Sequence, residues 1–503
     1  MRPTAVPLAL LCAFPLLLPP HAAAQAPKPL EAAAETITEQ DVIRHIRVIA
    51  DDSMLGRDTP SRGLELTAQY VADRFKAFGL TPGGENGTWF QRYPITRRHI
   101  DADHSVISLA CGSETGRASF ASAARYLQGT VPDGPVAGNV LLVGGAIGPD
   151  QAAAAVPGRV VLFLMDRARP SADQVLHAIN LAGAKAVILL SDADSAGFAG
   201  RVVAQTRDRT AMDIGVPRPL IVEVREAVMA GPLAVAGVKP AAVRAAGRPI
   251  VKDLLSLGAT LDVKEIVTSR QTAPNTIGIL PGTDPKLRNE YVLFSAHMDH
   301  IGITPGQPDS INNGADDDAS GTTAVMELAE AFSRPDARPR RSLIFLTVSG
   351  EEKGLWGSRY FSEHPVVPLK DVVADINIDM IGRNWPDTIV AIGKEHSDLG
   401  ATLNRVNAAH PELGMTAIDD RWPEERFYFR SDHYNFARKG VPILFFFNGV
   451  HEDYHRPSDS PDKIEPEKEA RIIRLIFYLG EEVASATERP KWKPESYKEI
   501  VEQ

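Results

Sequence analysis

The sequence predicts an α/β protein with a mostly parallel central sheet flanked by helices and an inserted small β-rich domain. Apolar runs of strand length alternate with helical stretches after residue 250, which is the pattern of a parallel sheet with crossover helices. A region of short β-rich runs precedes this pattern, between residues 115 and 250. The 503 residues exceed one ordinary domain, and a composition of 44% hydrophobic and 23% charged residues is that of a globular protein.

The first residues, "MRPTAVPLALLCAFPLLLPPHAAAQ", predict a secretory signal over residues 1–24. A positive start, a short apolar stretch and small residues before the cleavage point are its usual parts. A membrane anchor is the alternative, but the prolines and the short apolar run fit a spanning helix poorly. We therefore expect an exported protein, periplasmic or secreted, with no membrane span after cleavage. The mature chain keeps one cysteine, Cys111, so an internal disulfide is excluded.

The part from residue 25 to 114 begins with helices. "TEQDVIRHIRVIA" has an N-cap threonine before apolar residues at helical spacing, and "GLELTAQYVADRFKAFGL" repeats the pattern up to a glycine. We expect this part to belong to the same domain as residues 251–503. The insert of residues 115–250 contains runs such as "GRVVLFLMDRA" and "AKAVILLSD" around one short helix, "DQVLHAINLAGA".

The part from residue 251 to 503 contains five apolar strands, among them "EYVLFSAHMDH", "RSLIFLTVSGEE" and "VVADINIDMIG". Function in such sheets collects at the carboxyl ends of the strands. The net charge of −10 argues against nucleic acid as the partner, because phosphate binding requires clustered Lys and Arg.

Acidic residues and histidines follow these strands one after another. They are His297 and Asp299, Asp316, Asp317 and Asp318, Glu351 and Glu352, Asp379, and His455. Imidazole with carboxylate is a ligand set suited to zinc, or less often manganese or cobalt. We therefore predict a shared metal site at this edge of the sheet.

Two neighbouring metals need one carboxylate that bridges them, and Asp316, in a glycine-flanked acidic loop, is the best candidate. His297 and Asp379 would hold one metal, and Glu352 and His455 the other. Asp299 is two residues from His297 and on a strand would face the same way, which suits an acceptor that orients the imidazole.

The motifs "HMDHIG", "GADDDASG", "SGEEKGLWGS", "NIDMIG" and "YHRPSDSPDKI" stand in the order found in the bimetallic zinc aminopeptidase family. The chain resembles this family, which includes bacterial leucyl aminopeptidases, glutamate carboxypeptidase II and the catalytically silent transferrin receptor, over residues 37–80 and 275–479. The resemblance implies two Zn²⁺ ions per chain, peptide substrates and hydrolysis at a free amino terminus. It implies the five ligands His297, Asp316, Glu352, Asp379 and His455.

The resemblance also implies that Glu351 is the general base and that the Asp316–Asp317 peptide is cis. The insert is similar to a protease-associated domain. An oxyanion donor is expected at Tyr428 in "FYFRSDHYNF", with Tyr454 as the alternative. The remaining histidines near the motifs are expected to be hydrogen-bonded loop residues: His300, His433 and His451.

Three other functions stay open. A carboxypeptidase of the same family would need basic residues for a substrate carboxylate, for which Arg383 and Arg430 are candidates. A glutaminyl cyclase would use one zinc, and a binding protein on the same scaffold would lack the base. A serine hydrolase or a single-zinc protease is unsupported, because neither "GxSxG" nor "HExxH" is present. Side-chain specificity and oligomeric state are not predicted.

Overall fold

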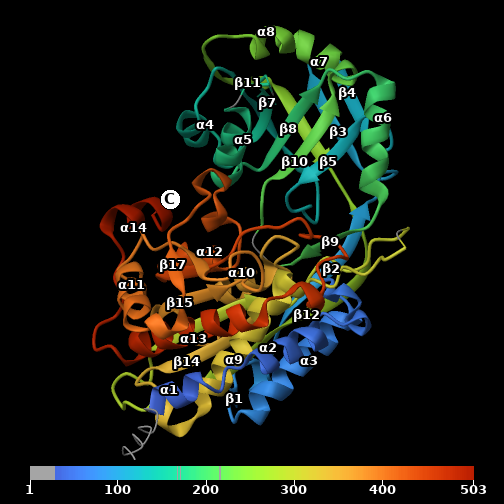
Figure 1. Ribbon diagram of the computed structural model, residues 1–503. Helices are drawn as coiled ribbons and strands as arrows, with labels where there is room; N and C mark the ends of the chain where they lie inside the picture. Colours follow the sequence, from blue (N-terminus) through green and yellow to red (C-terminus); the bar gives the residue numbers. More distant parts are fainter. Residues whose placement is uncertain (1–28, 167, 170, 214–216, 307, 503) are drawn as a thin grey trace, which may run out of the picture.

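The computed structural model describes residues 29–166, 168–169, 171–213, 217–306 and 308–502. The predicted signal over residues 1–24, with its cysteine, lies outside these residues. The described part forms a larger body of helices around a sheet and a second body, in green at the top of Figure 1, built on a second sheet. Across the described ranges, no helix is long and apolar enough to cross a membrane.

The larger body contains a ten-stranded sheet in the order β17-β16-β18-β15-β13-β14-β12-β2-β9, with β1 paired to β12. Its strands are β1 (Thr81–Pro82), β2 (Phe90–Ile100), β9 (Arg209–Met212), β12 (Glu265–Leu280), β13 (Tyr291–His297), β14 (Ser342–Val348), β15 (Val372–Ile378), β16 (Thr388–Ile392), β17 (Thr416–Ile418) and β18 (Ile443–Phe446). The four strands β18, β15, β13 and β14 run parallel to one another. Strands β12, β2, β9 and β1 pair antiparallel, as does β16 with β18, so the sheet is mixed and its parallel part is its centre.

Helices cover both faces of the parallel centre. Those of the larger body are α1 (Pro29–Ala34), α2 (Glu39–Ile49), α3 (Arg62–Ala77), α9 (Gly321–Ser333), α10 (Trp356–Glu363), α11 (Leu399–Ala409), α12 (His433–Ala437), α13 (Pro466–Ser485) and α14 (Pro494–Ile500). Phe294 and Phe345 pack toward α2, α9 and α13, whereas their neighbours Leu293 and Ile344 pack toward α10 and α12. Because both faces are covered, strands β13 to β15 are apolar and buried almost throughout.

The second body contains an eight-stranded sheet in the order β4-β3-β11-β6-β7-β8-β10-β5. Its strands are β3 (Val106–Cys111), β4 (Glu114–Ser119), β5 (Ala124–Gln128), β6 (Val136–Gly145), β7 (Val160–Leu164), β8 (Ala186–Ser191), β10 (Leu220–Arg225) and β11 (Pro249–Asp262). Its helices are α4 (Pro149–Ala155), α5 (Ala172–Leu181), α6 (Ser195–Val203), α7 (Ala230–Val235) and α8 (Pro240–Arg244). The two faces of this sheet have separate apolar cores.

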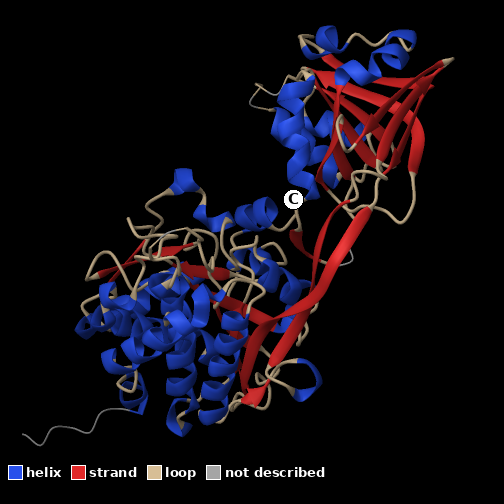
Figure 2. Cartoon of the chain, turned by 90° about the vertical axis from the view of Figure 1, so that its right-hand side faces the viewer, coloured by secondary structure: helices blue, strands red, loops and turns tan. Residues whose placement is uncertain are grey.

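The second body extends beyond the boundaries expected from the sequence. Its sheet starts at Val106 and ends at Asp262, outside residues 115–250, because β3 and β11 are its own strands. Within that range, β9 leaves the second sheet and pairs with β2 of the larger body. Figure 2 shows the long strands that connect the two bodies, where β2 and β12 pair antiparallel.

Candidate metal centre

The carboxyl ends of three neighbouring parallel strands bring the predicted residues to one edge. Strand β13 ends at His297, β14 ends three residues before Glu351, and β15 ends directly before Asp379. Strand β13 lies between β14 and β15, so these ends are adjacent. The acidic turn Ala315–Ser320 (η5), which opens helix α9, packs over the same edge.

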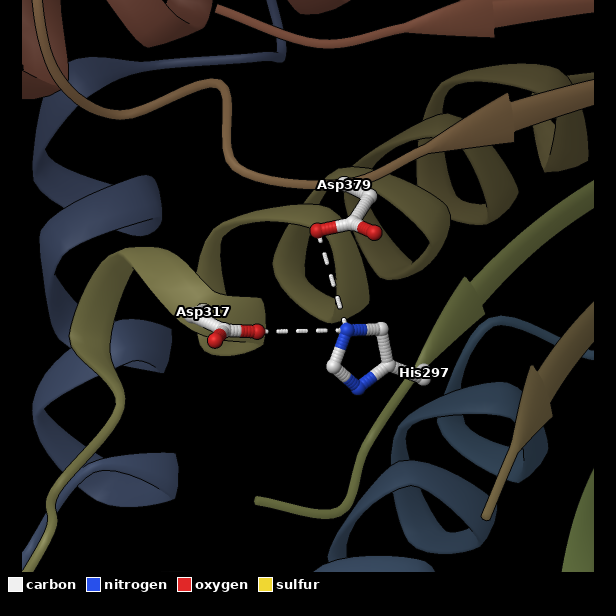
Figure 3. Close-up of side chains that lie close together, drawn as sticks. All are labelled: His297, Asp317 and Asp379. Carbon is white, nitrogen blue, oxygen red and sulfur yellow. Dashed lines mark ion pairs between the residues drawn. The ribbon is translucent and has the colours of Figure 1, made fainter. Parts of the chain in front are cut away.

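His297, Asp317 and Asp379 form the first candidate metal group. The His297 Nε2 atom lies 3.3 Å from Asp317 Oδ1 and 3.6 Å from Asp379 Oδ1. Figure 3 shows the two carboxylates converging on this nitrogen from different elements. Ser431 donates a hydrogen bond to the other Asp379 oxygen at 2.9 Å, which fixes the carboxylate.

Glu352, Asp317, His300 and His455 form the second group. His455 Nε2 lies 3.2 Å from Asp317 Oδ2 and 3.3 Å from Glu352 Oε2. His300 Nδ1 lies 2.9 Å from Glu352 Oε1 and 3.5 Å from Asp317 Oδ2. Asp317 thus presents one oxygen to each group and is their shared carboxylate.

The bridge expected at Asp316 is wrong in position by one residue. The Asp316 carboxylate accepts a hydrogen bond from the Gly382 N–H at 2.7 Å, and its other oxygen lies 3.3 Å from His451 Nε2. It belongs to neither candidate metal group of the described residues. It lies instead near Glu469, whose pKa is raised first by burial and then by the Asp316 charge.

The backbone of the acidic turn explains this difference. Gly314 has a φ of 58°, and Asp317 and Asp318 depart from helical geometry, so side-chain direction changes at every residue. Three consecutive aspartates therefore cannot be assigned by spacing alone. The cis peptide also differs from the expectation, since it joins Asp317 to Asp318 and not Asp316 to Asp317.

Asp318 and Asp459 hold this turn in place. Asp318 accepts hydrogen bonds from the backbone N–H groups of His297, Gly321 and Met380, which ties the turn to β13 and β15. Asp459 accepts from the N–H groups of Asp316 and Asp317. Both carboxylates are fully buried.

Arg57 is a further residue that the sequence did not reveal. Its guanidinium is fully buried and donates to four backbone carbonyls, those of Ile49, Met298, Asn313 and Gly314. Burial lowers its pKa, and the charges of nearby aspartates, Asp317 first, oppose that shift. One arginine in "MLGRDTP" carries no motif, so its role is visible only in three dimensions.

Asp299 acts on the Glu351 loop as well as on His297. The His297 Nδ1 atom lies 3.2 Å from the Asp299 carbonyl oxygen and 3.7 Å from its carboxylate. The carboxylate also accepts hydrogen bonds from the Glu351 N–H at 3.2 Å and from the Thr59 hydroxyl at 3.0 Å. The same hydroxyl accepts from the Gly350 N–H, so Asp299 fixes the turn that presents Glu351.

The adjacent glutamates have different surroundings. Burial raises the pKa of Glu351 well above its ordinary value, and His297 opposes the shift. Burial alone would raise the pKa of Glu352 too, but hydrogen bonds from His300 and His455 bring it below its ordinary value. Gly350 has a φ of 72°, which a residue with a side chain rarely adopts, and it turns the chain at this point.

Tyr454, and not Tyr428, faces the candidate site. Tyr454 lines the same cavity as Glu351, and burial followed by the Asp317 charge raises its pKa. The Tyr428 ring lies between His396 and His433 instead, with ring centroids at 4.6 and 5.5 Å. The expectation for Tyr428 is therefore wrong, because the 3₁₀ turn that contains it points the phenol into the packed interior.

Of the three histidines set aside in the sequence, one lies in the site. His433 is buried against Phe445 and contacts the Tyr428 carbonyl oxygen at 2.8 Å, as expected of a structural residue. His451 faces Asp316. His300 belongs to the second group, and strand alternation could not place it because β13 ends three residues earlier, at His297.

The donors present fit a divalent metal such as zinc. One ligand atom each from His297, Asp317 and Asp379 lie within 4.8 Å of one another, as do one each from His300, Asp317 and Glu352. Imidazole with carboxylate is a zinc ligand set. Several of these buried atoms, namely Asp317 Oδ2, Glu352 Oε1 and both ring nitrogens of His300, make no hydrogen bond of good geometry, although they lie close to one another. Buried polar atoms without partners are rare, and a bound ion would satisfy them.

A small cavity opens beside these groups. Its wall is apolar on one side, formed by Phe427, Phe445, Phe447 and Val450. Arg430 also lines it, about half exposed and 3.4 Å from Glu425. The site can therefore hold a small apolar group next to the carboxylates.

Comparisons with known proteins match this segment. Residues 275–480 match the model of peptidase family M28. The leupeptin-inactivating enzyme 1 of Streptomyces exfoliatus is 29% identical over 208 residues, which are 41% of this chain and 42% of that protein. A probable leucine aminopeptidase of Arthroderma benhamiae is 28% identical over 231 residues, 44% of this chain and 61% of that protein. The chain thus aligns with about half the length of these relatives.

Solved structures also resemble the chain. An aminopeptidase from Aneurinibacillus sp. strain AM-1 is 19% identical with a TM-score of 0.49, covering 92% of this chain and 98% of its own. A zinc aminopeptidase from Bacillus subtilis is 18% identical with a TM-score of 0.47, covering 90% and 97%. Residues 275–480, less than half of the chain, are thus similar to peptidase family M28.

Proposed function

We propose that this protein is a zinc-dependent exopeptidase that removes amino-terminal residues from peptides. The observation that carries the proposal is the pair of histidine–carboxylate groups joined by Asp317, with Glu351 on the wall of the same cavity. The match of residues 275–480 to peptidase family M28 and the similarity to a probable leucine aminopeptidase support it.

His297 and Asp379 would hold one Zn²⁺ ion, Glu352, His455 and His300 would surround the other, and Asp317 would contact both. When bound, the two ions would lower the pKa of a water molecule and polarise the scissile carbonyl. Because the second group contains His300, its ligand set differs from the one that the sequence predicted.

Glu351 would accept the proton of the attacking water at its carboxylate and deliver it to the leaving amine. Burial raises its pKa and favours the protonated form, and the positive charge of bound ions would oppose that shift. Asp299 and Thr59 would hold the Glu351 turn in place during the reaction. The Tyr454 hydroxyl would donate a hydrogen bond to the oxyanion.

The apolar wall of the cavity favours a substrate with an apolar amino-terminal side chain. Arg430 on the same cavity keeps a carboxypeptidase as the second candidate, since a guanidinium there could bind a terminal carboxylate. Arg383 is the weaker candidate, because Asp453 already pairs with it at 3.2 Å. Export through residues 1–24 and a protease-associated role for the insert belong to the same proposal.

Two peptides decide the polarity. One is free at both ends, and the other is acetylated at its amino terminus. An aminopeptidase releases the first residue of the free peptide and leaves the acetylated peptide intact. Release of the last residue from the acetylated peptide would support the carboxypeptidase instead, and no cleavage of either would support a silent binding protein.

Glu351→Gln tests the base separately. The variant should lose turnover and keep the metal content of the wild type, because Gln fits the same space and Glu351 is not in either ligand group. Wild-type turnover in this variant would refute the assignment.

A further inference from the structure

A second cleft, of about 490 Å³, lies where the two bodies meet. Arg98 of β2 and Arg359 of α10 line it from the larger body, and Tyr126 and Arg218 line it from the insert. Arg209 of β9 lies over the Tyr126 ring, with its guanidinium carbon 4.2 Å from the ring centroid. The cleft is thus lined by four arginines.

Some of these arginines are already neutralised. Arg98 pairs with Asp213 at 2.6 Å and with Glu265 at 3.4 Å, and Arg209 pairs with Glu265. Because the charges of these two arginines are balanced by the two acids, this part of the cleft does not by itself indicate a ligand.

The other end of the cleft carries excess positive charge. Arg359 lies 3.2 Å and Arg438 3.8 Å from the single carboxylate Glu363. Arg218 approaches from the insert and has no ion pair among the described residues, while its backbone is tied to Thr130 in both directions. Partial burial, then the charges of Arg359 and Arg438, lower its pKa. Two guanidinium groups thus share one carboxylate, and Arg218 adds a third positive charge without an ion-pair partner of its own in the described chain.

This end of the cleft adjoins the Glu351 loop. Trp356 lines the cleft, and its N–H donates to the Gly350 carbonyl at 2.8 Å, directly before Glu351. Glu351 itself lines the cavity at the metal groups. One tight turn therefore presents Glu351 to the candidate active site and Trp356 to the arginine-lined cleft.

We propose that the cleft binds a carboxylate of the peptide substrate, with Arg218 and Arg359 as its ligands. Arginine suits this task because its planar group binds both carboxylate oxygens. The carboxylate would be the terminal group of a short peptide or an acidic side chain downstream of the cleaved bond. This inference rests on the proposed aminopeptidase function and adds a preference for acidic substrates that the apolar cavity does not supply.

The test compares four substrates. Leucine p-nitroanilide has no carboxylate, leucyl-glycyl-glycine has a terminal one, its amide has none, and leucyl-glycyl-glutamic acid α-amide has only a side-chain carboxylate. Arg218→Gln should raise KM about tenfold for substrates with the recognised carboxylate, since a charge-assisted hydrogen bond is lost. It should leave the p-nitroanilide unchanged. Which of the two acidic peptides responds identifies the carboxylate.

Arg117→Gln is the matched control, because Arg117 is an exposed arginine of the same insert on β4, outside the cleft lining. Arg359→Gln should reproduce the effect, with Arg438 still beside Glu363. The proposal is overturned if the acid and amide forms have equal KM values and Arg218→Gln changes neither of them. Hydrolysis of the p-nitroanilide would still support the aminopeptidase in that case. If the p-nitroanilide is not hydrolysed, the proposed function fails, and calorimetric binding of the acidic peptides against the amide decides the cleft on its own.

Discussion

Glu327 on helix α9 is a buried acid whose ionisation opposes folding. It is 1% exposed, its Oε1 atom has no hydrogen-bond partner, and His45 Nε2 lies 3.4 Å away. Burial raises its pKa from 4.5 to about 9. At pH 7 the folded chain therefore keeps a proton on Glu327 that the unfolded chain has released.

The magnitude follows from linkage. Glu327 does not lower the free energy of unfolding below pH 4.5. As the pH rises from 4.5 toward 9, that free energy falls, because Glu327 ionises in the unfolded chain before it ionises in the folded chain. Each pH unit above 4.5 costs about 1.4 kcal/mol, so the loss at pH 7 is up to about 3 kcal/mol. Gln resembles the protonated acid, so Glu327→Gln should recover this free energy at pH 7 and more at pH 8.

Urea unfolding at pH 5, 7 and 8 measures the difference between Glu327→Gln and the wild type. The gain should be small at pH 5 and grow with pH. Glu39→Gln, an exposed change on helix α2, is the control and should show no such trend. A Glu327→Gln protein that is less stable than the wild type at pH 8, or a difference independent of pH, would refute the reasoning.

Three other outcomes follow from the site and its surroundings. Tyr454→Phe should lower kcat about a hundredfold by removing an oxyanion donor, and Tyr428→Phe should leave kcat within about threefold of the wild type. Steady-state kinetics on leucine p-nitroanilide measure both, and a larger loss in Tyr428→Phe would make Tyr428 the oxyanion donor instead. Arg57→Met should lower the free energy of unfolding by about 3 kcal/mol or more, because four carbonyls and a cluster of acids lose their buried cation; urea titration measures it, and an unchanged midpoint would count against this role. Burial lowers the pKa of His45 from 6.5 to about 4, so the free energy of unfolding should fall as the pH drops between these values. In urea titrations over this pH range, His45→Gln should make that fall smaller, and an unchanged fall would contradict this role.

The location of the site can be predicted from the sequence because the candidate residues follow recognisable strands. His297 and Asp379 stand at or just beyond the ends of buried apolar runs, and adjacent parallel strands bring such ends together. The general location therefore needs only the order and polarity of the strands, although the metal role of each residue stays a proposal.

The details fail where regular periodicity ends. Asp316 and Asp317 differ by one position in a turn whose dihedral angles change at each residue, so spacing cannot choose between them. His300 and Tyr428 lie in irregular segments, and only their packing determines where each side chain points. The mixed sheet has a similar origin, since β2 leads into the insert and β12 leads out of it, so that the two strands pair antiparallel.

The shared carboxylate is the centre of this account, and metal content tests it most directly. Purified wild type, Asp317→Asn and Asp316→Asn are loaded with zinc, dialysed and measured by mass spectrometry, with circular dichroism to establish that each is folded. We expect two zinc ions per chain in the wild type and in Asp316→Asn, and fewer than one in Asp317→Asn. Loss of zinc from Asp316→Asn with two ions retained in Asp317→Asn would contradict the account.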